Sequence, residues 1–116
     1  MSSRYQKAKE TLQKIEAEIK KEKADALGRS GDRLSDALTA LRALEEELEA
    51  KIKSAPVLTP QIRRELNQEI ESFNQKREEI LRFRYYLIVH REALGLRKHT
   101  EVDRLFPIPK KRAPLK

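Results

Sequence analysis

A connector containing two prolines, residues 54–60, divides a chain whose apolar side chains otherwise follow helical spacing. Pro56 cannot continue a preceding helix, because it lacks a backbone N–H and its ring clashes with the turn before it. Thr59 followed by Pro60 is typical of a helix N-terminus, where a hydroxyl caps free amides and proline occupies the first position. The connector therefore predicts the end of one helix and the start of another.

Heptad-like spacing on both sides of this connector predicts long helices. Apolar residues recur every three or four positions from Tyr5 to Ile19 and from Leu34 to Ile52, and at steps of three, four or seven from Ile62 to Leu94. Gly95 is a natural stop for the last of these patterns. Charged residues make up 39% of the chain and aromatic residues only 5%, which favours helices and argues against a sheet. Such helices bury a narrow seam instead of a globular core.

The segment between the first two patterns, Gly28 to Gly31, leaves two architectures open. Two glycines cost a helix roughly 2 kcal/mol relative to alanine, which favours a turn there, with Asp32 capping a new helix. However, the apolar stripe keeps its phase across the glycines, which slightly favours one continuous, kinked helix. In that case the small residues 24–31 would lie opposite 82–89 and face Phe83, Tyr85, Tyr86 and Val89. The fold class is all-α: an elongated antiparallel, coiled-coil-like hairpin, or a three-helix bundle.

The expected organisation is one helical domain, residues 1–106, followed by an extended Pro/Lys/Arg tail, residues 107–116. Its helices are expected at about 3–27, 32–53, 60–94 and 101–106. Thr100 and Asp103 have the spacing of a capping box for the last helix. Pro107 ends that helix, because proline cannot continue it.

The segment 80–109 is the part of the chain whose apolar side chains most need to be covered by another surface. It holds four of the six aromatic residues, and between Ile80 and Val89 apolar side chains point almost all round the helix. One neighbouring helix covers only one side of such a segment. We expect either a homodimer or another protein partner to cover the rest, while the competing interpretation is that the short helix and residues 106–109 fold back over it. The partner-binding candidates are Phe83, Tyr85, Tyr86, Ile88, His90, Arg91, Arg97, Lys98 and Phe106.

The net charge of +7 is concentrated in the same region. Residues 1–81 hold 16 basic and 16 acidic side chains, whereas residues 82–116 hold ten basic and three acidic ones. This asymmetry indicates either a solubilising tail or an anion-binding surface that would suit RNA, a ribosome or DNA. The candidates for that role are Arg84, Arg104, Lys110, Lys111 and Arg112.

Several functional classes lack a sequence signature. The chain has no cysteine, so disulfides and thiolate metal sites are excluded. His90 and His99 do not have a metal-ligand spacing, and no nucleophile–base order or phosphate-binding loop occurs. We therefore expect no catalytic, metal or cofactor site and no small-molecule substrate.

The sequence contains no signal-peptide-like or membrane-spanning apolar run, and its apolar residues do not form an interfacial face. The expectation is a cytoplasmic, non-enzymatic adaptor, scaffold or assembly component; the alternative is a nucleic-acid-binding protein.

Overall fold

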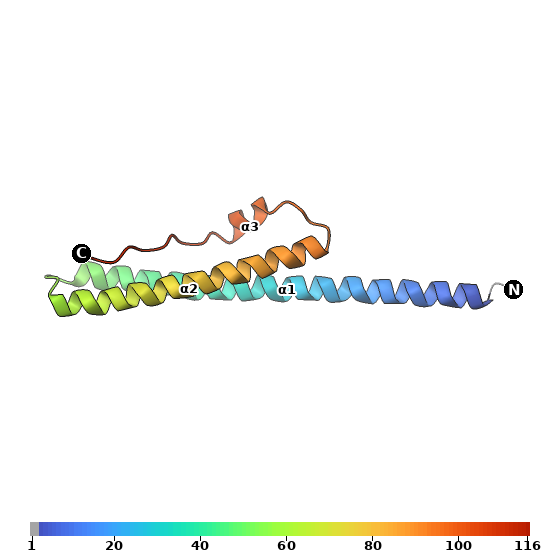
Figure 1. The fold of residues 1–116 in the computed structure, drawn as a ribbon, viewed down its shortest axis with the longest axis horizontal. Coiled ribbons are helices and arrows are strands. Elements are labelled where there is room, and N and C mark those ends of the chain that lie inside the picture. Colours follow the sequence, from blue (N-terminus) through green and yellow to red (C-terminus); the bar gives the residue numbers. More distant parts are fainter. Residues whose placement is uncertain (1–2) are drawn as a thin grey trace.

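The computed structural model describes residues 3–116 and contains three helices. Two long helices, α1 (Ser3–Ser54) and α2 (Pro60–Ala93), pack antiparallel into a hairpin, and a short helix, α3 (Thr100–Leu105), lies beside it (Figure 1). The molecule measures 87 × 22 × 16 Å. The all-α elongated hairpin is thus confirmed, and the three-helix bundle is not adopted.

The first helix is continuous through both glycines. The expected helices over 3–27 and 32–53 are one helix of 52 residues, and Asp32 lies inside it instead of capping a second one. Neither Gly28 nor Gly31 has a positive φ, so the backbone there is ordinary helix. The apolar stripe that keeps its phase through this segment gives the physical reason, because one continuous helix places Leu27 on the same face as Leu34 and Leu38, where it packs against the core.

The core is a single seam between the two long helices. Leucines at helical spacing on α1 meet large apolar side chains of α2, and one residue of α3 joins them. The buried set comprises Leu34, Leu38, Leu41, Leu48, Leu66, Ile70, Phe73, Ile80, Leu87 and Val102. No residue between 3 and 25 contributes to it, because α2 ends before it reaches that part of α1 (Figure 1).

Local chemistry fixes both ends of α2. Thr59 Oγ1 accepts a hydrogen bond from Ile62 N at 3.2 Å, and Pro60 occupies the first helical position, as the connector predicts. At the other end, Gly95 adopts φ +87°, Gly95 N donates to Glu92 O and Leu96 N donates to Arg91 O. This pair of bonds is a Schellman motif, which reverses the chain after α2.

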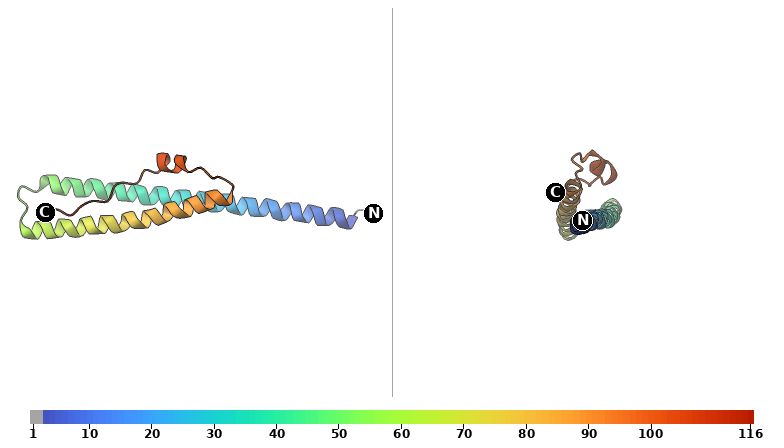
Figure 2. Two further views of the ribbon diagram at one scale, coloured as in Figure 1. Left: turned by 45° about the horizontal axis from the view of Figure 1, so that its top comes forward. Right: turned by 90° about the vertical axis from the view of Figure 1, so that its right-hand side faces the viewer.

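That reversal brings α3 and the C-terminal tail (residues 107–116) back along the hairpin. Figure 2 shows α3 to one side of the two long helices, with the tail running from it toward the connector. The capping box expected at Thr100 and Asp103 is wrong: His99 is the N-cap and makes no side-chain capping bond. Asp103 instead accepts from Arg84 across the space between α3 and α2, at 2.7 Å.

Candidate interaction surfaces

The tail is held by asparagines on α2 that bind its backbone. Asn74 Nδ2 donates to Arg112 O at 2.9 Å, and Asn74 Oδ1 accepts from Arg112 N at 2.9 Å. Asn67 repeats the pattern with Leu115, at 3.1 and 2.7 Å. The asparagines are seven residues apart on a helix, about 10.5 Å, and their partners are three residues apart in an extended chain, about 9–10 Å. The two periods match, so one straight tail satisfies both amides.

Charged side chains tie the same tail to both long helices. Arg77 Nε of α2 donates to Pro109 O at 2.6 Å, and Arg42 Nη2 of α1 donates to Pro107 O at 3.1 Å. Arg112 Nη1 lies 2.7 Å from Glu49 Oε1 on α1. The hydrogen bond and the charge of Arg112 lower the pKa of Glu49 below its ordinary value. The tail therefore bridges the two long helices on one side of the hairpin.

In this arrangement, the chain itself covers many of the apolar side chains of the segment 80–109. Phe106 and Ile108 pack against the core beside the buried Val102, so the fold-back cover expected as the competing interpretation is present. Phe83 is partly buried against the core, and the Arg33 guanidinium lies 5.7 Å from its ring centroid. Ile88 is half-buried.

Two predicted partner-binding residues have internal polar partners instead. His90 Nδ1 is hydrogen-bonded to Ser30 Oγ of α1. Arg91 Nη2 donates to Lys98 O at 2.9 Å and so fixes the turn after α2. Their roles in the fold are therefore visible, while a partner-binding role remains a prediction.

Part of the aromatic segment of α2 stays uncovered. Tyr85, Tyr86 and Val89 are 63%, 49% and 40% exposed. The two tyrosine rings meet edge to face, with centroids 6.0 Å apart and an interplanar angle of 62°. The sequence interpretation placed these tyrosines opposite the small residues 24–31, but both rings are largely exposed, and the residue of α2 that contacts Ser30 in that segment is His90. We call Tyr85, Tyr86 and Val89 the tyrosine patch.

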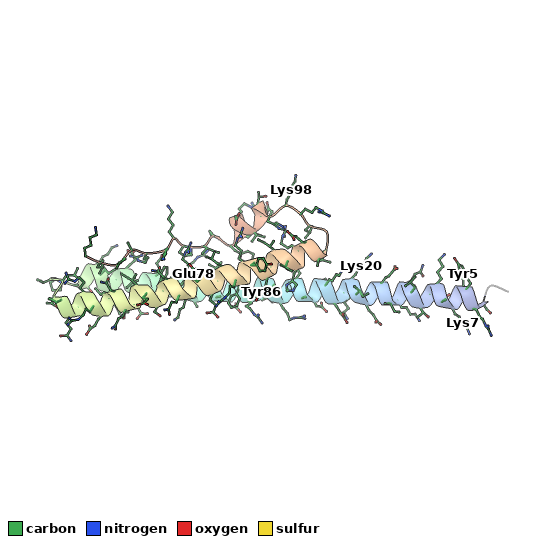
Figure 3. The ribbon with its side chains drawn as sticks, viewed as in Figure 1. Tyr5, Lys7, Lys20, Glu78, Tyr86 and Lys98 are labelled. Carbon is green, nitrogen blue, oxygen red and sulfur yellow. The ribbon has the colours of Figure 1, made fainter. Side chains whose placement is uncertain are left out.

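Three of the five predicted anion-binding residues lie beside carboxylates of the chain, and one of these three, Arg104, is itself exposed. Arg84 pairs with Asp103, Arg104 with Glu101, and Arg112 with Glu49. Lys110 and Lys111 are exposed, as are the partner-binding candidates Arg97 and Lys98 (Lys98 is labelled in Figure 3). The structure thus does not gather all five residues into one cationic surface.

A second uncovered apolar surface lies where the sequence interpretation placed no site. Residues 3–25, which we call the N-terminal arm, are all exposed, and they carry Tyr5, Leu12, Ile15 and Ile19 with exposed fractions of 73, 56, 47 and 44%. The stripe itself is evident in the sequence. The sequence interpretation overlooked the difference in helix length. Because α1 is continuous and α2 has only 34 residues, α2 does not extend alongside the first 23 residues of α1.

No family model, curated protein or solved structure matches the chain. None of the helices within residues 3–116 combines the length and apolar content needed to cross a bilayer. Over the same range, no three histidine or acidic side chains come together as a metal site requires.

Proposed function

We propose that this protein is a non-enzymatic helical assembly component that docks a protein partner through apolar side chains left uncovered by its own fold. Two surfaces qualify: the tyrosine patch on α2, which belongs to the segment 80–109, and the N-terminal arm. The observation that carries the proposal is the arm, where four large apolar residues at heptad spacing lie on a helix with no neighbour among the described residues.

The energetic argument concerns the side chains on the arm. Burying a large aliphatic or aromatic side chain completely is worth about 1.5–3 kcal/mol. A chain whose stability is typically about 5–15 kcal/mol gains substantially if a partner covers four of them. Heptad spacing also indicates that the partner presents an amphipathic helix, because the side chains of such a helix fit between those of the stripe.

Nucleic-acid binding remains the second candidate and has less support. Lys110, Lys111, Arg97 and Lys98 are exposed cations, but Arg84, Arg104 and Arg112 already face carboxylates of the same chain. A nucleic-acid complex would weaken steeply with salt, because binding releases counterions from the phosphates. Apolar docking would change little with salt.

Site-specific photocrosslinking in the cells that produce the protein tests the proposal. A benzoylphenylalanine replaces Leu12 in one variant and Tyr86 in a second, with Glu46, exposed on the hairpin, as the control position. We expect protein adducts from position 12, position 86 or both, and none from position 46. If irradiation gives no protein adduct from either test position, the proposed function is wrong.

A further inference from the structure

The N-terminal arm has the side-chain pattern of a coiled-coil strand. With Tyr5 at heptad position a, Leu12 and Ile19 also fall at a, and Ala8, Ile15 and Glu22 fall at d. Figure 3 shows Tyr5 and Lys7 on opposite sides of α1, as these positions require. The stripe therefore has a polar back and one polar residue, Glu22, in its seam.

We propose that a second copy of this chain covers the stripe, and that the two arms pair antiparallel with Leu12 opposite Ile15 of the second copy. The inference rests on the proposed function, because it names the partner of that same surface. The two-fold arrangement is closed, since each arm presents the same surface to the other.

Side-chain sizes match across every layer of this pairing. In an antiparallel coiled coil each a residue faces a d residue of the other strand. Leu12 then meets Ile15, the small Ala8 meets the large Ile19, and Tyr5 meets Glu22. The tyrosine hydroxyl can donate to the glutamate, so the one carboxylate in the seam gains a hydrogen-bond partner. Symmetry repeats each contact, which gives six layers.

The charges that flank the seam match in the same register. Antiparallel strands bring e positions together and g positions together. Lys9 at e then lies beside Glu16 at e of the second copy, and Arg4 at g lies beside Asp25 at g. With the symmetry copies these are four attractive pairs, and Thr11 beside Glu18 adds no repulsion.

Other registers and the parallel orientation are less favourable. If one antiparallel strand slides by one heptad, Lys9 lies beside Lys9 of the second copy in one direction and beside its Lys23 in the other. Both contacts are repulsive. A parallel pair sets Arg4 at g against Lys9 at e, offset by Glu18 against Lys23. The hairpin lies at one end of the arm (Figure 1), so the antiparallel pairing also places the two hairpins at opposite ends of the paired arms.

A charge reversal at an exposed position distinguishes these arrangements without threatening the fold. In the antiparallel dimer the substitution Lys9→Glu sets a new carboxylate beside each Glu16, whereas in a parallel dimer the same carboxylate would attract Arg4. We expect sedimentation equilibrium to show a dimer for the wild-type chain and a dissociation constant about tenfold higher for Lys9→Glu. The double variant Lys9→Glu/Glu16→Lys restores dimerisation, and Lys7→Glu, the same charge change on the opposite face, leaves it unchanged.

Spin labels measure the orientation directly, and the absence of cysteine allows single labelling sites. Gln13 and Gln6 both fall at heptad position b, and in the antiparallel dimer labels at Gln13→Cys are almost level with each other along the strands, which gives the shorter interspin distance. Labels at Gln6→Cys are separated along the axis by about 22 Å in the antiparallel dimer. Equal short distances at both positions would indicate parallel strands and overturn the pairing.

The outcomes separate this inference from the proposed function. A chain that stays monomeric at all accessible concentrations, or a dimer that Lys9→Glu leaves unchanged, overturns the inference. If adducts from position 12 then have masses that do not correspond to twice 13.6 kDa, the proposed docking function survives with a different partner. Absence of any adduct from positions 12 and 86 removes both.

Discussion

At the scale of single residues, the three glycines have different roles. Gly95 ends α2 with φ +87°, a conformation that other residues adopt at a steric cost. Gly28 and Gly31 lie within α1, and a Cβ at either position would meet nothing within 4 Å. The fold therefore requires a glycine only at position 95.

Alanine substitutions test this difference. Gly28→Ala and Gly31→Ala should each raise the free energy of unfolding by about 0.5–1 kcal/mol, because alanine has the higher helix propensity and the lower entropy when unfolded. Gly95→Ala should lower it by about 1–2 kcal/mol through strain in the left-handed region. Urea denaturation followed by circular dichroism measures all three. A destabilised Gly28→Ala or Gly31→Ala variant would show that α1 needs a distortion there.

At the scale of elements, the tail behaves as an added layer whose attachment is mostly through its backbone. Asn67 and Asn74 contact the peptide groups of Leu115 and Arg112, so these contacts do not depend on which side chains the tail carries. Replacing Asn74 with alanine removes two hydrogen bonds and should weaken tail docking by about 1–2 kcal/mol. The long helices should remain folded, because Asn74 lies outside the buried seam.

Hydrogen exchange of the Arg112 amide is the direct measurement for this prediction. In the Asn74→Ala variant the amide should exchange several-fold faster, while the amides of Leu34 to Leu48 exchange as in the wild type. Gln68→Ala removes an exposed amide side chain beside Asn67 and serves as the matched control. Unchanged protection of Arg112 in Asn74→Ala would show that the other tail contacts suffice.

The connector and the stop at Gly95 were predictable from sequence because their causes are local. Thr59 caps a helix that starts one residue later, and Gly95 forms bonds within its own turn. The docked tail was not predictable to the same degree. Asn67 and Asn74 read as ordinary polar residues of an exposed helix face, and their partners are backbone atoms, which leave no pattern in a sequence. Likewise, Arg84, Arg91 and Arg112 read as free cations until the fold places acceptors beside them.

At the scale of the whole molecule, α1 contains one region that packs against the rest of the chain and one that does not. Residues 27–54 of α1 lie in a hairpin reinforced by α3 and the tail, whereas residues 3–25 extend as a single helix of about 34 Å. A helix extending from a packed one avoids the cost of nucleation. Only its own backbone hydrogen bonds protect the arm, because nothing else among residues 3–116 covers it.

Concentration-dependent hydrogen exchange tests how this difference responds to self-association. At low concentration, arm amides should exchange orders of magnitude faster than those of the hairpin core, because opening the uncovered arm requires no disruption of the core. If two arms pair, raising the concentration slows exchange in residues 3–25 and leaves the core around Leu41 and Phe73 unchanged, because only the arm gains new contacts. In the Lys9→Glu variant, the arm amides should continue to exchange fast at concentrations at which those of the wild-type arm become protected. Slow, concentration-independent exchange of the wild-type arm would mean that the single helix is stable by itself, and the energetic case for a partner on its stripe would then fail.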